Sequence, residues 1–454
     1  MKHLLLPLLV LTLASEAADR PNLVVIMADD LGWRDLHGYG NSRVDTPALD
    51  QLAAEGMRFT QGYAASPVCT PTRAAMMTGQ APARLRITNH APGHPDGFTI
   101  KGSTLQEAEN LRHLPLAAVT VAERLSAAGY ATAHVGKWHL SYVRRGETGL
   151  AEKDLRPEHQ GFDVNVGGGD NGGPPSYFAP YRIAALADGR EGEYLPERLA
   201  DEAIAFMRQH KDRPFYLNWW PYSVHYPMQA REALIAKYRQ RKDLKDPVYA
   251  AMIEAMDTVI GRFLKALDEA GLRDNTLVLF KSDNGGYNGD NRPLRGFKGM
   301  LYEGGIRVPW IVRWPGRVKP GTTEATPVIS MDCYPTLLEV AGLPPTENHP
   351  LDGRSLLPLL TQSPGFERDT LYFHYPNYAF HQQNRLGSAL REGPYKLIRY
   401  DDDGSLELYD LSNDLGEKRN LAGQSPDLAR RLEAKLDAWL RECEARRPRK
   451  STVN

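Results

Sequence analysis

The sequence predicts an α/β fold in which a large, mainly parallel mixed sheet is sandwiched by helices. A smaller C-terminal antiparallel sheet with one helix is expected to follow it. Short apolar runs alternate with amphipathic segments over most of the chain, the order expected of parallel strands joined by helices. Beyond about residue 370 the pattern changes to paired strands and a terminal helix. The 454 residues have room for both units, and we assign residues 19–368 to the large unit and residues 369–454 to the C-terminal unit.

The large unit is predicted to begin with a buried strand and a helix. Asn22–Met27 is an uninterrupted apolar run, typical of a strand that is covered on both faces. The following helix has Thr46 as its expected N-cap and Pro47 at its first position, and Gly56 lies just past its end.

Strands and helices then alternate up to residue 313. Gly129 and Gly271 follow amphipathic segments and mark the ends of two helices. The predicted elements are a helix over Val119–Ala128, a strand over Ala131–Gly136, a helix over Glu197–His210, a strand over Pro214–Trp219, a helix over Val248–Ala270, and strands over Thr276–Phe280 and Val308–Arg313.

The C-terminal unit is predicted to contain an antiparallel hairpin and a helix. Ala389–Tyr400 and Leu406–Leu411 are rich in strand-forming residues, and Asp401–Gly404 between them has the composition of a turn. Apolar residues from Leu428 to Leu440 recur at helical spacing, which predicts a final helix with one buried face.

The composition excludes some classes of function. The formal net charge is −1, so the chain lacks the basic excess expected of a nucleic-acid-binding protein. Residues 1–18 are typical of a secretory signal, with Lys2 before the apolar Leu4–Leu13 and a small-residue cleavage site at Ser15–Ala17. No run is apolar and long enough to span a bilayer. We therefore expect an exported protein, either periplasmic or secreted.

The chain has three cysteines, too few for a disulfide framework. We expect Cys333 and Cys443 to be two buried thiols, and a disulfide between them is the alternative.

The third cysteine lies in the most informative motif, Cys69-Thr-Pro-Thr-Arg73. Pro71 favours the first turn of a helix, Ala74–Met77 are good helix formers, and Gly79 is a plausible stop. Cys69 is therefore expected just before a helix begins, where free N–H groups favour anions. Arg73, one turn into the helix, projects back towards the same point. A buried cysteine beside a structural arginine is the alternative interpretation, so the motif depends on its context.

That context comes from polar residues that follow four predicted strands. Because ligands bind at the carboxyl ends of the strands in an open α/β sheet, these residues are expected to converge. They are Asp29 and Asp30, Lys137 and His139, His225, and Asp283 and Asn284.

Two groups within this set have distinct chemistry. Asp29, Asp30, Asp283 and Asn284 offer only oxygen ligands, which suits Ca²⁺, or Mg²⁺ as second choice, over zinc. Lys137 and His139 flank Trp138, so on an extended segment their side chains point to the same side.

A glycine-rich loop follows at residues 161–180. Gly167–Gly172 formally matches a dinucleotide-binding fingerprint, but Pro174 and Pro175 follow where that motif requires a helix, so we exclude it. Asp170 and Asn171 could instead hydrogen-bond to sugar hydroxyls, with a purely structural loop as the alternative.

Taken together, these motifs resemble the type I, formylglycine-dependent sulfatases of the alkaline phosphatase superfamily. The resemblance covers nearly the whole mature chain and rests on Cys69–Gly79, Asp29-Asp30, Gly136–His139, Asp283-Asn284 and Glu303–Pro309. It implies that a formylglycine-generating enzyme converts Cys69 to formylglycine. It also implies that position 69 completes the metal site with Asp29, Asp30, Asp283 and Asn284. Within the last stretch, Glu303 and Arg307 are expected to form a structural ion pair.

The resemblance further implies a role for each catalytic residue. Arg73 and the metal ease deprotonation of hydrated formylglycine, whose oxygen attacks sulfur. Lys137, Lys298 and His225 neutralise the sulfate oxygens, and His225 with Lys298 protonates the departing alcohol. His139 then removes a proton from the second hydroxyl, which expels sulfate.

The expected substrate is an O-sulfated carbohydrate, with the galactose or N-acetylgalactosamine configuration favoured. The loop at residues 161–177 resembles one in bacterial sulfatases of glycan breakdown, and Asp170, Asn171 and Arg295 are the candidate substrate-binding residues. One alternative is a phosphonate or phosphate ester hydrolase of the same superfamily. The other is a non-catalytic homologue that binds sulfated glycans.

Overall fold

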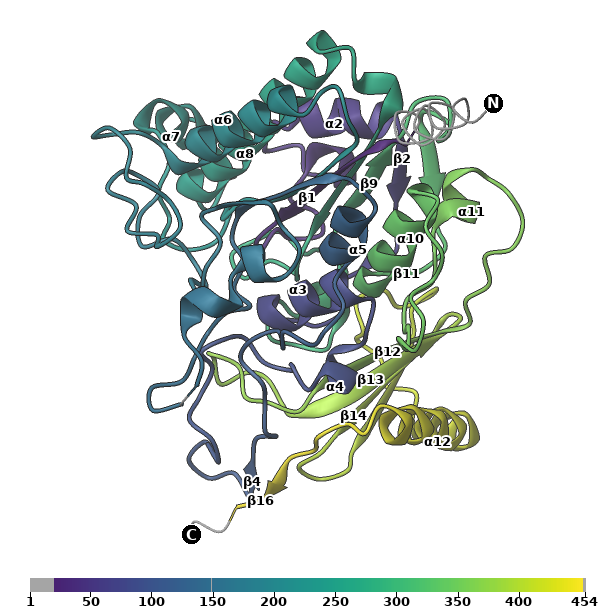
Figure 1. The fold of residues 1–454 in the computed structure, drawn as a ribbon. Helices are drawn as coiled ribbons and strands as arrows, with labels where there is room; N and C mark the ends of the chain where they lie inside the picture. Colours follow the sequence, from purple (N-terminus) through teal and green to yellow (C-terminus); the bar gives the residue numbers. More distant parts are fainter. Residues whose placement is uncertain (1–19, 148, 452–454) are drawn as a thin grey trace, which may run out of the picture.

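The computed structural model describes residues 20–147 and 149–451, so the predicted signal segment lies outside the described residues. Its centre is a mixed sheet of eight strands in the order β10-β2-β9-β8-β1-β7-β5-β6. The predicted α/β class, with a large mainly parallel sheet and a small C-terminal antiparallel one, is confirmed (Figure 1).

Four neighbouring strands in the middle of this sheet run parallel. The register aligns Ala28 with Ser282 and Gly136 with Trp220, so the strands end at nearly the same level. These strands are β8 (Thr276–Ser282), β1 (Asn22–Ala28), β7 (Phe215–Trp220) and β5 (Ala131–Gly136).

The flanking strands complete the sheet on both sides. β6 (Val164–Val166) pairs parallel with β5, whereas β9 (Trp310–Arg313) runs antiparallel to both β8 and β2 (Met57–Phe59). β10 (Thr322–Glu324) pairs parallel with β2 at the other edge. The strand predicted over Val308–Arg313 starts two residues later, at Trp310. The sequence pattern did not predict that this strand runs antiparallel to its neighbours.

Helices cover both faces of the sheet (Figure 1). Along β1, Val24 and Ile26 belong to one apolar cluster and Leu23 and Val25 to the other, as the two-residue repeat of a strand requires. The first cluster includes residues of α2 (Pro47–Ala54), α6 (Leu195–Gln209), α7 (Glu232–Arg239) and α8 (Pro247–Glu269). The second includes residues of α3 (Cys69–Thr78), α5 (Val121–Ala127) and α10 (Cys333–Val340).

The start of α2 shows a tertiary contact that the local sequence did not predict. Thr46 is the N-cap residue, as expected, but its side chain makes no capping hydrogen bond. Instead Asp257 of α8 accepts hydrogen bonds from the backbone N–H groups of Ala48, at 3.0 Å, and Leu49, at 2.8 Å. Asp257 therefore satisfies donors that a helix N-terminus leaves free.

The C-terminal unit is a four-stranded antiparallel sheet covered by α12 (Pro426–Glu442). Its strands are β12 (Thr370–Tyr375), β13 (Gly387–Glu392), β14 (Tyr395–Tyr400) and β15 (Leu406–Asp410). The single strand predicted over Ala389–Tyr400 is wrong, because Gly393, at φ +55°, and Pro394 turn the chain between β13 and β14. The predicted pairing across Asp401–Gly404 and the final helix are confirmed.

The remaining elements are short. They are β3 (Gly62–Tyr63), α4 (Pro82–Leu85), β4 (Leu105–Gln106), α9 (Glu303–Ile306), β11 (Val328–Ile329), α11 (Leu357–Leu360) and β16 (Arg449–Lys450), with 3-10 helices η1 (His37–Tyr39), η2 (Glu152–Leu155), η3 (Pro157–His159), η4 (Arg273–Asn275) and η5 (Ser330–Asp332).

Two further predictions concern the cysteines and the membrane. Cys333 and Cys443 are buried free thiols, as expected. None of the helices in the described part of the chain is both long and apolar enough to cross a bilayer.

Candidate active site

The four parallel strands bring the predicted polar residues to one place. Lys137 Nζ, just after β5, lies 2.7 Å from Asp29 Oδ2, just after β1. The backbone N–H of Asp30 donates to Asp283 Oδ1, just after β8, at 3.2 Å. His225, after β7, places Nε2 3.7 Å from Asp30 Oδ2. Strand order thus positions all four groups at the carboxyl edge of the sheet.

The Cys69–Arg73 motif forms the start of α3. Val68 is the N-cap, so Cys69 is the first residue of the helix rather than the residue before it. Arg73, one turn on, is completely buried and donates to Asp283 Oδ2 through NH2, at 2.6 Å, and through Nε, at 3.1 Å. It also donates to the carbonyl of Lys137 at 2.9 Å. Arg73 therefore joins the ends of β5 and β8.

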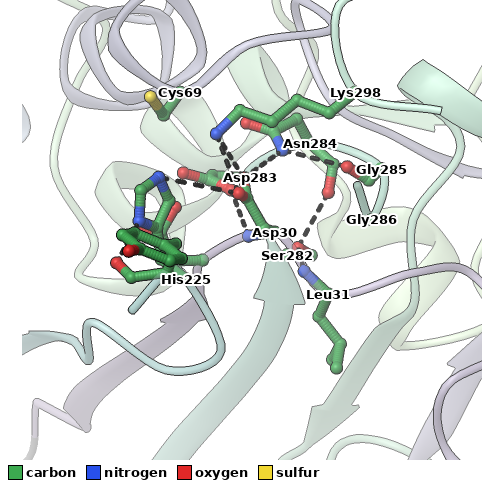
Figure 2. Close-up of polar contacts among 12 residues, drawn as sticks. Asp30, Leu31, Cys69, His225, Ser282, Asp283, Asn284, Gly285, Gly286 and Lys298 are labelled. Carbon is green, nitrogen blue, oxygen red and sulfur yellow. Dashed lines mark hydrogen bonds and ion pairs between the residues drawn. The ribbon is translucent and has the colours of Figure 1, made fainter. Parts of the chain in front are cut away.

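Lys298 reaches the same centre from the loop between β8 and α9. Its Nζ lies 2.7 Å from Asp30 Oδ1 and 2.8 Å from Oδ2. Figure 2 shows this ammonium group between Cys69 and the carboxylates, with the His225 ring facing them from another side. The loop is held against the segment that precedes Cys69, because the N–H of Gly299 donates to the carbonyl of Pro67 at 2.8 Å.

Buried charge is balanced in this centre. Asp29, Asp30 and Asp283 face Arg73, Lys137 and Lys298, and all but Asp30 and Lys298 are fully buried. Burial raises the pKa of Asp29, and the positive charge of Lys137 opposes that shift. Burial alone would also raise the pKa of Asp30, but Lys298 and His225 outweigh it and hold that pKa below its usual range.

The carboxylates and Asn284 fit a divalent cation. Among the described residues, Asp29 Oδ1 and Asn284 Oδ1 are buried oxygen atoms without a hydrogen-bond partner. Ligand atoms of Asp29, Asp30 and His225 also lie within 4.8 Å of one another. Orphaned buried oxygen atoms are costly unless a cation or donor meets them. A set dominated by carboxylate and amide oxygens suits a hard cation.

His139 is held as a neutral base beside Cys69. Its Nε2 donates to the carbonyl of Ala91, so the unprotonated Nδ1 faces Cys69 Sγ at 3.3 Å and Thr70 Oγ1 at 3.3 Å. Burial, followed by the charge of Lys137, lowers the pKa of His139 well below its usual value. The predicted extended segment is not extended at His139, where φ is +60°, yet Lys137 and His139 both reach the site.

His225 has the opposite orientation. Its Nδ1 donates to the carbonyl of Tyr226 at 2.8 Å, which turns Nε2 towards Asp30. Burial and then the positive charge of Lys298 lower the pKa of His225 to about 3. An anion bound beside Lys298 would oppose that charge and raise the pKa of His225.

The glycine-rich loop packs against the two histidines. A Cβ on Gly172 would lie 2.9 Å from His139 Nε2, and one on Gly173 would lie 2.5 Å from His225 Nδ1. Side chains at these positions would displace the rings, so glycine is required there. Gly172 lines a cavity that opens beside Cys69 and His139, whereas Asp170 and Asn171 are not among the residues that line this cavity.

Arg295 also lies outside the pocket lining. Its guanidinium is 3.8 Å from the Tyr302 ring centroid, and it donates to Tyr409 Oη at 3.0 Å and to the carbonyl of Glu417 at 2.8 Å. The expected pair of Glu303 and Arg307 is present at 3.4 Å.

A cavity of about 500 Å³ opens above Cys69, Asp30 and Lys298. It is also lined by His90, Tyr226, Tyr287 and Phe380, which the sequence analysis did not select. Tyr226 and Tyr287 closely follow His225 and Asn284, so proximity to those motifs was an available signal. Phe380 lies in the C-terminal unit, between β12 and β13, and had no such signal.

Comparison with known proteins gives consistent matches over this fold and site. The Sulfatase family model matches residues 21–343, and the model for the N-sulphoglucosamine sulphohydrolase C-terminal region matches residues 296–445. The chain is 33% identical to a sulfatase of Formosa agariphila, with 94% of this chain and 89% of the relative covered. It is 34% identical to arylsulfatase A of Homo sapiens, with 95% of this chain and 91% of the relative covered.

A solved structure, Ps i-CgsB in complex with k-i-k-neocarrahexaose, has the same fold. The TM-score is 0.78 at 27% identity, and 93% of each chain is covered.

Proposed function

The chain belongs to the sulfatase family and is a sulfuric ester hydrolase, and from this premise we propose that it removes an O-sulfate group from a carbohydrate. We propose formylglycine at position 69 as the nucleophile and Ca²⁺ as the metal. The observation that carries the proposal is the position of Cys69. Its Sγ lines the cavity, 3.3 Å from the unprotonated nitrogen of His139, above a charge-balanced cluster of carboxylates and cations.

The proposed metal ligands are Asp29, Asp30, Asp283, Asn284 and the group at position 69. The buried Oδ1 atoms of Asp29 and Asn284, which accept no hydrogen bond from the described residues, support this assignment. The metal, with Mg²⁺ as second choice, supplies positive charge that favours an ionised nucleophile and a bound sulfate. The hydrated aldehyde supplies one hydroxyl for attack on sulfur and a second whose deprotonation expels sulfate.

The chain's own side chains bind the sulfate and move protons. Lys137 and Lys298 are proposed to hold sulfate oxygens, and Arg73 to orient and polarise the group at position 69. A sulfate bound beside Lys298 favours the protonated form of His225, which then donates its Nε2 proton to the departing alcohol oxygen, because the Nδ1 proton is committed to the Tyr226 carbonyl. Nδ1 of His139 accepts the proton that completes turnover, because Nε2 is committed to the Ala91 carbonyl.

The proposed substrate is a carbohydrate sulfate of galactose or N-acetylgalactosamine configuration. A similar fold is known in complex with k-i-k-neocarrahexaose, which supports a sugar substrate. Asp170 and Asn171 stay candidates for contacts at the rim, since the adjacent Gly172 lines the cavity. For Arg295 we propose an indirect role through the Lys298 loop, because Tyr302, Tyr409 and Glu417 occupy its guanidinium.

Maturation and export are part of the proposal. A formylglycine-generating enzyme would convert Cys69, and the segment over residues 1–18 would direct the chain to the periplasm or outside the cell. Peptide mass spectrometry of protein from its native host, across Cys69 and at the mature N-terminus, tests both steps. Unmodified Cys69 in fully active protein would remove formylglycine from the proposal.

Comparative turnover tests the reaction. Protein carrying the modification should hydrolyse an aryl sulfate with a much higher kcat/KM than the matching aryl phosphate or phosphonate. The reverse preference would favour the phosphate or phosphonate alternative. Binding of sulfated sugars without turnover of any ester, by protein that carries formylglycine, would favour a non-catalytic binding protein.

A further inference from the structure

Exposed aromatic side chains gather at the mouth of the catalytic cavity. Among the described residues, five large hydrophobic side chains are exposed, and three of them line this cavity. These three are Tyr226, Tyr287 and Phe380, with exposed fractions of 71%, 46% and 45%. An apolar patch that remains in water beside a reactive centre is typical of a ligand-binding surface.

Two of these rings form one wall although they come from different units. Tyr287 follows β8 in the large unit, and Phe380 lies between β12 and β13 in the C-terminal unit. Their ring centroids are 5.1 Å apart and their planes are at 68°. This edge-to-face pair is a favourable aromatic arrangement, so the two rings support each other. The C-terminal unit therefore contributes directly to the cavity.

The aromatic wall is tied to the catalytic lysine. The Tyr287 ring lies 5.5 Å from that of Phe297, which lies 5.0 Å from the ring of His381. His381 Nε2 donates to the carbonyl of Lys298 at 2.8 Å. Lys298 Nζ lies 5.5 Å from the centroid of Phe380. A ring on this wall is therefore held at a fixed position relative to the sulfate-binding end of the cavity.

The charged side chains of the cavity are confined to its base. Asp30 and Lys298 lie there, whereas the outer wall is made of aromatic, apolar and amide groups such as Met228 and Asn288. Burial, with the nearby charge of Lys298, lowers the pKa of His90 to about 3, so this wall residue is neutral at pH 7. Nothing in this part of the described chain offers a cation to a second sulfate.

An adjoining cavity shares Tyr287 and Asn288, and its lining includes two arginines and the exposed Lys245. Its two arginines, Arg43 and Arg292, both pair with Asp290, at 2.7 Å and 2.6 Å. Among the described residues that line the cavity above Cys69, Lys298 is the one lysine or arginine, so a second anionic group on a ring bound inside that cavity would lose water without gaining a partner of opposite charge.

We propose that Tyr287 and Phe380 form the binding site for the apolar face of the sugar ring that carries the scissile sulfate, and that this ring bears no other anionic group. This inference rests on the proposed function and deepens it by naming the ring-binding residues. It also fits the proposed sugar configuration. The axial hydroxyl of a galactose ring leaves the opposite face with a continuous patch of C–H groups, which an aromatic surface can cover.

The test compares substrates with and without a ring. With protein carrying formylglycine, Phe380→Ala should lower kcat/KM for a galactose monosulfate about tenfold, mostly through KM, which corresponds to about 1.4 kcal/mol. Turnover of a straight-chain alkyl sulfate should fall by less than about twofold, because it presents no ring face. Tyr287→Ala should show the same selectivity. In wild-type enzyme, a second sulfate on the ring should lower kcat/KM.

Three control variants separate ring binding from damage to the fold. Phe380→Tyr and Tyr287→Phe keep a ring and should retain the wild-type preference for the sugar over the alkyl sulfate. Leu116→Ala removes an exposed hydrophobic side chain that does not line the cavity, and it should leave kcat/KM unchanged for both substrates. If Phe380→Ala fails to fold, Tyr287→Ala decides the question.

The outcomes distinguish this inference from the proposed function. Equal losses for the sugar and alkyl sulfates, or no loss for either, would overturn ring binding while leaving sulfatase activity in place. A gluco-configured or aryl sulfate that depends on Phe380 more strongly than the galactose ester does would overturn the choice of ring. Faster turnover of the disulfated ring would overturn the requirement for an otherwise uncharged sugar. Failure to hydrolyse any sulfate ester would instead reject the proposed function.

Discussion

Nδ1 of His139 lies 3.3 Å from Sγ of Cys69, although 70 positions separate the two residues. The contact is directional, because the other ring nitrogen donates to the carbonyl of Ala91. The side chain at position 69 thus faces a lone pair rather than an N–H group. The same position borders the cavity and the buried carboxylate cluster, which makes Cys69 the centre of the first prediction.

Cys69→Ala should lower turnover of any sulfate ester by roughly 10⁴-fold or more, because it removes the proposed nucleophile. Steady-state rates with an aryl sulfate measure the loss, and mass spectrometry should find formylglycine at position 69 of active wild-type protein. Cys443→Ala, at a buried free thiol away from the cavity, is the matched control and should retain activity. A Cys69→Ala protein of normal activity would rule out the sulfatase mechanism proposed here.

The two histidines should respond differently to the leaving group. His225→Ala should lower kcat for sugar sulfates by about 10²–10⁴-fold, because sugar alcohols leave poorly without a proton donor. Activated aryl sulfates should be affected far less. In His225→Ala, kcat should depend more steeply on the pKa of the leaving group than it does in the wild type. Equal losses for both substrate types would exclude His225 as the acid.

His139→Ala should stop the reaction at a later stage. Loss of its Nδ1 acceptor should leave sulfate attached at position 69 of the protein, detectable as an added mass on the intact chain. A burst of product followed by slow turnover is the expected kinetic signature. A variant that turns over normally without retaining sulfate would show that another group takes the proton.

Asp283→Asn should lower metal content and activity together, because Asp283 is a proposed ligand and the partner of Arg73 at 2.6 Å. The amide keeps the shape of the side chain, whereas Asp283→Ala would remove the nearest carboxylate partner of the buried Arg73, at a cost of about 3–5 kcal/mol. Elemental analysis should find one Ca²⁺ in wild-type protein. The exposed Asp212→Ala is the control, and zinc at full occupancy in native protein would contradict the assignment.

Asp257 should give the protein a pH-dependent stability that its amide analogue lacks. Burial raises the pKa of Asp257 from 3.8 to about 7, although two backbone N–H groups of α2 oppose the shift. The folded protein therefore binds this proton more tightly than the unfolded chain does. The contribution of Asp257 to stability is present below pH 3.8 and declines as pH rises to about 7.

The corresponding measurement is denaturant unfolding between pH 4 and 7. The difference in unfolding free energy between wild type and Asp257→Asn should fall with rising pH, by up to about 1.4 kcal/mol per pH unit. Asp257→Ala should destabilise at every pH, by about 1–2 kcal/mol, because it removes the cap of α2. If the difference in unfolding free energy between wild type and Asp257→Asn does not change with pH, the raised pKa of Asp257 is contradicted.

Much of this protein could be predicted from local sequence. The apolar runs gave β1, β5, β7 and β8 within a few residues, because a strand buried on both faces needs a continuous apolar segment. Proline and glycine marked the ends of α2 and α3 for equally local reasons. The polar residues after the strands were predicted to meet, since parallel strands carry their C-terminal residues to one edge.

Other features depend on contacts between distant segments, which leave no periodic signal in either segment. The antiparallel direction of β9, the cap that Asp257 supplies to α2 and the position of Phe380 beside Lys298 are of this kind. The motifs determined by themselves which chemical groups are available for reaction. Tertiary packing decided how these groups are oriented and which rings enclose them, because orientation and enclosure arise only when segments far apart in the chain fill the same space.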